Sequence, residues 1–207
     1  MSIIYISGDV ETTGPTPGTD FYSMIAFGMV VVDDPSMTFY RELKPLNRQY
    51  VPEALRVGAK GLECLAQYKG IPEYDPTHVA FEPERVLDVL ESKGSDPAKA
   101  MREAYEWVEF VKQNGKVRYC ARPVMFDGAF MNHYFIKFCM ENPLGHSGED
   151  INSLYRGSKG DENASISEFH QGEIPHNALQ DAIIQAADFR RVREEMEKNA
   201  AVRKMFK

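Results

Sequence analysis

Three apolar segments near the start of the sequence restrict its fold more than any other feature. Residues 2–10, 24–32 and 37–43 are rich in β-branched and aromatic side chains, a composition that is typical of consecutive β-strands. We expect these segments to form an antiparallel meander. The first strand ends near an acidic pair, Asp9 and Glu11.

Helical patterns alternate with a single strand candidate through the rest of the chain. The expected helices cover residues 52–61, 83–92, 97–114, 126–142 and 177 to beyond 193, and the expected strand covers residues 117–121. Residues 126–142 are apolar nearly all round, which predicts a buried helix, whereas residues 145–160 form a polar, glycine-containing region. The chain is therefore predicted to be an α/β protein with a mixed sheet flanked by helices.

Length and composition favour one soluble domain over residues 1–207. The shares of hydrophobic residues, 43%, and charged residues, 27%, are ordinary for such proteins. The three cysteines form no C-x-x-C pair, and the N-terminal apolar run has no basic flank and is soon interrupted by Gly8 and Asp9. These features argue against a secreted or membrane-bound protein. We expect a cytoplasmic protein that does not associate with membranes.

The acidic balance of the chain limits its partners. A formal net charge of −7 disfavours a protein that coats long duplex DNA, because neutralisation of phosphates dominates such binding. A nuclease is not excluded, since an enzyme that grips only the last few nucleotides can obtain positive charge from bound cations.

Asp9 and Glu11 are the first candidate site residues. They lie two apart on a strand, so their side chains point to the same face, roughly 6 to 7 Å apart. Divalent cations such as Mg²⁺ prefer oxygen ligands, and a pair of them can stabilise both reacting oxygens in phosphodiester hydrolysis. The alternative is that the acidic pair occupies a solvated strand end. Thr12, Thr13 and Gly14 follow as a polar turn that a ligand can approach closely.

Two further segments supply carboxylates and a histidine. In VMFDGAFMNHYF, Asp127 lies at the start of an apolar helix, where an acid can also serve only the helix dipole. In HNALQDA, Asn177 can cap a helix together with Gln180. His176 then lies in the preceding loop and Asp181 lies one turn into the helix. Such a histidine can take a proton from water near neutral pH, although a histidine before a helix is more often a surface residue.

The three segments together resemble the motifs of the DEDDh family of 3′-to-5′ exonucleases, which includes the proofreading subunit of bacterial DNA polymerase, oligoribonuclease and RNase T. GDVETTG resembles the first motif, VMFDGAFMNHYF the second and HNALQDA the third, in the same order. The resemblance covers residues 3–187. It implies an RNase H-like fold with a mixed central sheet.

The resemblance also implies roles for individual residues. It implies four carboxylates that bind two divalent cations, Mg²⁺ or Mn²⁺, and these are Asp9, Glu11, Asp127 and Asp181. It implies that His176 is the general base. The residues that match the substrate-binding part of the first motif are Thr12, Thr13 and Gly14.

The activity implied by the resemblance is hydrolysis of terminal phosphodiester bonds in single-stranded DNA or RNA, with release of nucleoside 5′-monophosphates. Single-stranded 3′ ends are the expected partner, and a homodimer is expected because RNase T-like relatives commonly dimerise. A noncatalytic nucleic-acid-binding module on the same fold is the alternative, and a nuclease that cuts internally is a third interpretation. The choice between DNA and RNA depends on contacts to the 2′-hydroxyl, which the sequence does not locate.

The sequence departs from the family pattern in several places. Ala121 and Arg122 stand where relatives often have His-Asn, and Arg122 is expected either to meet a phosphate or to be solvated. Residues 56–62 lack the histidine that relatives often have there. The separation of the first two motifs is long, which predicts an insertion over 73–95. Asp150 is expected to bond backbone amides rather than a metal.

Overall fold

The sheet has five strands in the part of the chain that the computed structural model describes, residues 2–18, 20–169 and 175–205. The strands are β1 (Ile3–Thr12), β2 (Met24–Val31), β3 (Asp34–Glu42), β4 (Lys116–Ala121) and β5 (Gly148–Asp150). Their order is β3-β2-β1-β4-β5. β1, β2 and β3 pair antiparallel, so the predicted meander is confirmed, and β4 pairs parallel with both β1 and β5.

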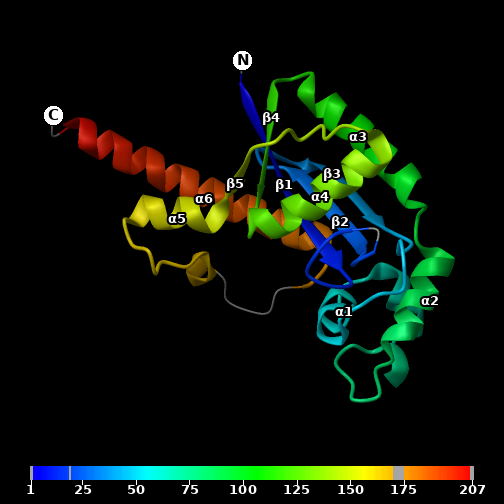
Figure 1. Ribbon diagram of the computed structural model, residues 1–207. Helices are drawn as coiled ribbons and strands as arrows, with labels where there is room; N and C mark the ends of the chain where they lie inside the picture. Colours follow the sequence, from blue (N-terminus) through cyan, green and yellow to red (C-terminus); the bar gives the residue numbers. More distant parts are fainter. Residues whose placement is uncertain (1, 19, 170–174, 206–207) are drawn as a thin grey trace.

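Helices lie on both faces of this mixed sheet (Figure 1). They are α1 (Pro52–Gly58), α2 (Pro83–Lys93), α3 (Pro97–Lys112), α4 (Val124–Cys139), α5 (Ile151–Lys159) and α6 (Ala178–Met205), with 3-10 turns η1 (Glu63–Tyr68), η2 (Pro72–Tyr74) and η3 (Ile166–Phe169). The expected cap of α3 is confirmed, because the Asp96 carboxylate accepts the Lys99 amide at 2.8 Å. The predicted ends are three residues too late for α1 and two residues too late for α3, because the backbone beyond each helix forms tighter i to i−3 bonds.

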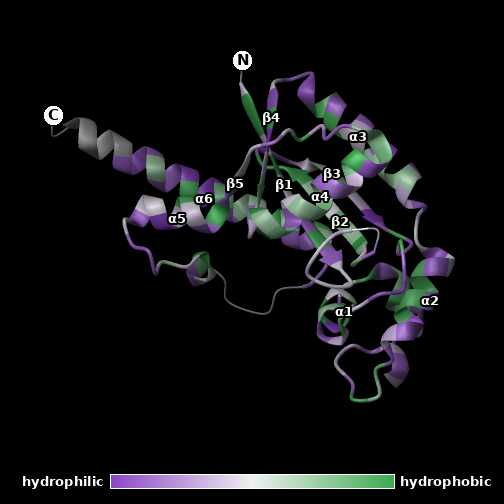
Figure 2. Ribbon diagram, viewed as in Figure 1, coloured by the Kyte–Doolittle hydropathy of each residue, from purple (hydrophilic) through white to green (hydrophobic). Residues whose placement is uncertain are grey.

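The sheet separates two apolar layers because alternate side chains of a strand point to opposite faces. Met29 and Val31 of β2 pack with α3 and α4, whereas Val30 packs with α5 and α6. Figure 2 shows hydrophobic residues along the central strands, between helices of mixed hydropathy. The predicted α/β class is confirmed, and α6 covers β1 and β2 on one face.

The outer side of α4 is exposed, so the prediction of a helix buried all round was wrong. Phe130, Tyr134 and Phe135 are fully buried, but Met125 is 82% exposed and Ile136 is 48% exposed. A helix in an outer layer can bury only the side that faces the sheet and its neighbouring helix. The apolar residues on the other side of α4 therefore contribute nothing to the core.

The polar region 145–160 contains β5 and α5, which the sequence did not predict. Asp150 joins the two elements. Its Oδ1 accepts the Ser153 amide at 2.8 Å and its Oδ2 accepts the Val124 amide at 3.2 Å. The prediction that Asp150 bonds backbone amides is confirmed, and this one side chain fixes the starts of both α5 and α4.

Residues 73–95 form η2 and α2, which belong to the packed body of the protein. Val86, Leu87 and Leu90 are fully buried and lie in one cluster with Leu55 of α1. That this segment is an insertion stays a prediction. Within the described residues, no helix combines the length and the apolar character needed to cross a membrane.

Candidate active site

The central strand β1 carries the first two carboxylates. Asp9 pairs with Gly28 and Glu11 with Ala26 of β2, so both acidic side chains leave the same face of the sheet. Burial raises the pKa of Asp9 well above its ordinary value, and the negative charges of Asp127, Glu11 and Asp181 raise it further. Burial also raises the pKa of Glu11, and the charges of Asp181 and Asp127 add to this effect. Both carboxyl groups therefore lie where adding a negative charge is energetically unfavourable.

Asp127 comes from the first turn of α4, as the sequence predicted. Its side chain is 2% exposed, and its Oδ1 accepts the Val10 amide at 3.1 Å. That hydrogen bond ties the start of α4 to β1 beside Asp9. Burial is the main cause that raises the Asp127 pKa to about 7, and the charge of Asp181 adds to it.

The start of α6 brings Asp181 and His176 to the same place. Asn177 caps the helix as predicted, since its Oδ1 accepts the Gln180 amide at 3.1 Å. Asn177 Nδ2 also donates to the Gly61 carbonyl at 2.8 Å, which attaches the loop before α6 to the end of α1. Burial raises the Asp181 pKa to about 6, against the lowering effects of Arg122 and the His176 amide.

All five proposed catalytic residues line one cavity of about 230 Å³. The cavity is lined by Asp9, Val10, Glu11, Arg122, Pro123, Phe126, Asp127, His176, Asp181, Ile184 and Gln185. Three of these residues, Glu11, His176 and Asp181, each offer a ligand atom within 4.8 Å of the others. Asp9 and Asp181, which are 172 residues apart in the sequence, thus line the same cavity.

The donor set of this cavity fits a hard divalent cation. Four carboxylates supply oxygen ligands of the kind that Mg²⁺ and Mn²⁺ bind. Asp181 Oδ1 is buried and has no hydrogen-bond partner in the described part of the chain, and a cation would satisfy it. Burial raises the pKa values of all four carboxyl groups, and repulsion by neighbouring carboxylates adds to it for Asp9, Glu11 and Asp127. A bound cation would offset both effects.

Two side chains of α6 that the sequence did not single out support the site. Gln185 Nε2 donates to Asp9 Oδ1 at 2.7 Å, one turn after Asp181. Asp188 is 3% exposed at its side chain and lies 3.5 Å from the Arg122 guanidinium. Arg122 is itself only 15% exposed at its side chain, so the interpretation of a solvated arginine was wrong. The sequence did contain a signal for these two residues, because the polar positions 181, 185 and 188 lie on one face of a helix.

The predicted substrate-binding residues form a hydrogen-bonded turn beside the cavity. Thr12 Oγ1 donates to the Gly14 carbonyl at 2.9 Å, and Thr13 Oγ1 accepts the Ser23 amide at 2.9 Å. Thr13 is fully buried. The two threonine side chains are thus used inside the protein, and a substrate contact of Thr12, Thr13 or Gly14 stays a prediction.

The metal-free protein should lose stability as the pH rises from about 4 to 7. The folded-state pKa values of Asp127, about 7, and Asp181, about 6, lie above the ordinary value of 3.8. The folded protein therefore holds protons that the unfolded chain has already released. The resulting stabilisation is complete below the ordinary pKa and is lost as the pH rises through the folded-state pKa values. Thermal unfolding in a chelator would measure the effect, and Asp127→Asn should flatten it. A melting temperature that rises with pH over this range would contradict the assignment.

Gly28 lets α6 lie directly on β2, so Gly28→Ala should be strongly destabilising. An added Cβ would lie 2.4 Å from the backbone N and Cα of Leu179. Displacing α6 should cost about 1 to 3 kcal/mol of unfolding free energy and should reduce activity, because α6 carries Asp181. Gly157→Ala is the matched control. A Cβ there meets nothing within 4 Å, and the change within α5 should stabilise by about 0.5 to 1 kcal/mol. Urea denaturation compares them, and equal stability of the two variants would refute the contact.

Comparisons with known proteins agree with this geometry. No protein-family model matches the chain. Its sequence is 33% identical over 206 residues to the 3′-5′ DNA exonuclease Cap18 of Escherichia coli, with 94% of each protein covered.

Similar folds occur among solved exonucleases. The nuclease domain of 3′hExo, a DEDDh family member, matches with a TM-score of 0.58 and 12% identity over 95% of this chain and 92% of that domain. A 3′-exonuclease that recognises a histone mRNA stem-loop gives 0.60 and 13%, over 94% of this chain and 63% of the other. Exonuclease I of E. coli with a dT13 oligonucleotide gives 0.60 and 12%, over 97% of this chain and 43% of the other.

The fold and the carboxylate cavity define an RNase H-like exonuclease domain, as the sequence predicted. The chain belongs to the DEDDh family of 3′-to-5′ exonucleases. A catalytic protein fits these relatives better than a noncatalytic nucleic-acid-binding module.

Proposed function

We propose that this exonuclease removes nucleoside 5′-monophosphates from the 3′ ends of single-stranded DNA, with Mg²⁺ or Mn²⁺ bound by its four clustered carboxylates and His176 as the general base. The observation that carries the proposal is the convergence of Asp9, Glu11, Asp127, Asp181 and His176 on one cavity. DNA is proposed as the substrate because Cap18 is a DNA exonuclease.

The residues of the cavity have different roles in the proposed reaction. Asp9, Glu11, Asp127 and Asp181 would hold the cations, which when bound supply electrostatic stabilisation of the attacking and leaving oxygens. Gln185 orients Asp9 through its 2.7 Å hydrogen bond, and the Val10 amide orients Asp127. His176 would take the proton of the attacking water, because an imidazole titrates near neutral pH.

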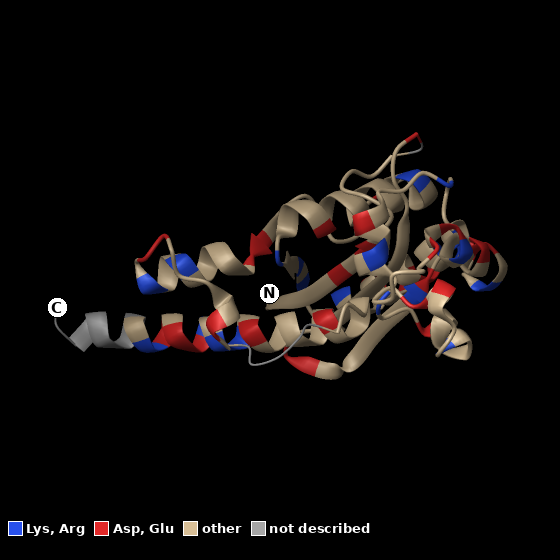
Figure 3. Ribbon diagram, turned by 90° about the horizontal axis from the view of Figure 1, so that it is seen from below, with Lys and Arg blue, Asp and Glu red and all other residues tan. Residues whose placement is uncertain are grey.

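The charges around the cavity suit a strand end better than a long duplex. Figure 3 shows acidic and basic residues interspersed along the coloured part of α6. Arg122 lines the cavity beside the carboxylates and can meet a phosphate there. Phe126 offers an aromatic ring in the same cavity, on which a base can stack.

Matched 5′-labelled DNA and RNA strands test the proposal directly. Each strand is supplied linear, with a blocked 3′ end, and as a circle that carries an internal label instead, in Mg²⁺, in Mn²⁺ and in a chelator. We expect a ladder that shortens from the free 3′ end of linear DNA, only with a metal. Cleavage of circles would show an internal nuclease, and binding without cleavage would show a noncatalytic module.

A homodimer and a cytoplasmic location complete the proposal. The family resemblance supports the homodimer, and the free thiols Cys64, Cys120 and Cys139 support the cytoplasmic location. Sedimentation equilibrium of the full chain tests the first, and a mass that stays monomeric at high concentration would reject it.

A further inference from the structure

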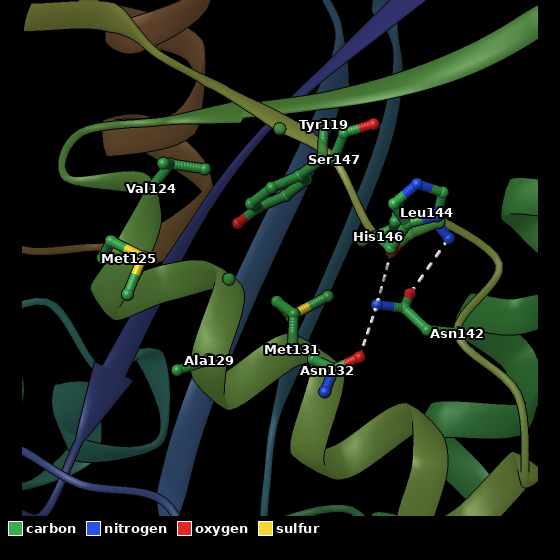
Figure 4. A pocket seen from close by; sticks show the side chains of 13 residues that line it. Tyr119, Val124, Met125, Ala129, Met131, Asn132, Asn142, Leu144, His146 and Ser147 are labelled. Carbon is green, nitrogen blue, oxygen red and sulfur yellow. Dashed lines mark hydrogen bonds between the residues drawn. The ribbon is translucent and has the colours of Figure 1, made fainter. Parts of the chain in front are cut away.

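A second cavity, of about 290 Å³, lies on the other side of the first turns of α4 (Figure 4). Met125 and Gly128 line this cavity, whereas the intervening Phe126 and Asp127 line the carboxylate cavity. The opposite wall is formed by Tyr119 of β4 and by the loop that runs from α4 to β5. The two cavities therefore share a helical wall, but their linings have different chemistry.

Tyr119 gives this cavity an unsatisfied polar group. The residue is 4% exposed, and its hydroxyl is buried without a hydrogen-bond partner in the described residues. Figure 4 shows its ring reaching across from β4 toward the start of α4. A buried hydroxyl without a partner is unfavourable, and a molecule in the cavity could supply the missing partner.

Hydrogen bonds hold in place the loop that forms one wall of the cavity. Asn142 Nδ2 donates to Asn132 Oδ1 at 3.0 Å and to the Gly145 carbonyl at 3.1 Å. Asn142 Oδ1 accepts the Leu144 amide at 3.0 Å. The first bond joins the loop to α4 and holds the Asn132 carboxamide at the cavity, and the other two hold the loop in shape (Figure 4). A ligand would meet a preformed surface, which reduces the entropy cost of binding.

The lining is uncharged and combines flat, apolar and hydrogen-bonding groups. Among the described residues that form it, none is Asp, Glu, Lys or Arg. Tyr119 offers an aromatic ring, Met125 and Met131 offer polarisable thioethers, and Asn132 and His146 offer hydrogen-bonding groups. The cavity volume lies near the lower limit, about 300 Å³, of small-molecule sites. This chemistry suits a neutral, planar heterocycle, and it disfavours a phosphate.

We propose that this second cavity binds a nucleobase, which packs against the Tyr119 ring and hydrogen-bonds to the Tyr119 hydroxyl and the Asn132 carboxamide. Stacking on aromatic rings and pairing with carboxamides are general modes of base recognition. The base can belong to a nucleotide upstream in the strand being degraded, and this alternative rests on the proposed function. It can also belong to a free nucleoside, and that alternative is independent of the proposed function.

Methionine-methyl NMR of the full chain, kept metal-free by a chelator, tests the proposal. Adenosine, guanosine, cytidine and thymidine are titrated separately, followed by a DNA strand with a blocked 3′ end. We expect saturable shifts at Met125 and Met131, with Met140 unmoved, because Met140 is 89% exposed and does not line the cavity. Shifts with the strand but with no nucleoside assign the site to substrate, and shifts with nucleosides alone assign it to a free ligand.

Three variants make the test specific. Tyr119→Phe should weaken binding by about 3- to 10-fold, the value of one hydrogen bond, and should raise the melting temperature of the ligand-free protein. Ala129→Trp, at an exposed position of the lining, should abolish the shifts. Ile136→Trp, on the exposed side of α4 outside the lining, should leave them unchanged.

The outcomes separate this proposal from the exonuclease activity. No shift with any nucleoside or strand, or shifts that survive Ala129→Trp, would overturn the nucleobase site and leave a cavity that holds water only. Cleavage assays in Mg²⁺ are run on the same preparations. Intact cleavage without shifts rejects only the nucleobase site, whereas nucleoside shifts without cleavage reject only the proposed function.

Discussion

Asp181→Asn should slow nucleotide release by roughly 10³-fold at saturating Mg²⁺, because cation ligation is expected to supply several kcal/mol of transition-state stabilisation. The amide keeps the shape of the carboxyl group but lacks its charge. Asp181 is 6% exposed and its Oδ1 has no protein partner among the described residues, so the change breaks no hydrogen bond of that atom. Single-turnover cleavage of labelled single-stranded DNA measures the loss.

The same substitution should stabilise the metal-free protein at pH 7.5. It removes a buried negative charge that raises the pKa values of Asp9, Glu11 and Asp127. Mg²⁺ should raise the melting temperature of the parent protein through preferential binding to the folded state, and that increase should shrink in Asp181→Asn. Glu197→Gln, at an exposed position of the same helix, is the matched control and should change neither quantity. A variant that cleaves at the parent rate would remove Asp181 from the mechanism.

Local sequence rules sufficed where one element positions a side chain. The alternation of β1 placed Asp9 and Glu11 on one face, and the cap at Asn177 placed Asp181 one turn into α6. Both inferences need only the geometry of a single strand or helix. The signals for α5 were also local, with Asp150 as its cap and Gly160 at its end, but they lay within a stretch whose polar composition concealed them.

Contacts between distant elements were not predictable in this way. The spacing of positions 181, 185 and 188 shows that they share a helical face, but not that this face meets β1. That outcome depends on Gly28, which permits α6 to lie against β2. The partnership of Arg122 with Asp188 likewise follows from packing between the β4–α4 connection and α6. The exposed side of α4 depends on which neighbours cover the helix, a property that its own composition does not contain.

His176→Asn should lower the cleavage rate by about 10²- to 10⁴-fold, the usual contribution of a general base. Asparagine is the better replacement because His176 has a φ of 54°, in the left-handed region that asparagine tolerates and alanine does not favour. The His176 amide also contributes a hydrogen bond that lowers the Asp181 pKa. A strained alanine could disturb that bond, and the loss of a base would then be confused with a displaced carboxylate.

Two further measurements isolate the role of the imidazole. The parent rate should rise with pH as the base loses its proton, and His176→Asn should lose this rise while keeping the Mg²⁺-dependent increase in melting temperature. His78→Asn, in a turn outside the carboxylate cavity, should retain the parent profile. If His176→Asn keeps both the rate and its pH dependence, another group accepts the proton. If it instead loses Mg²⁺ stabilisation to the extent that Asp181→Asn does, His176 acts as a metal ligand, because the imidazole lies within the same 4.8 Å cluster as Glu11 and Asp181.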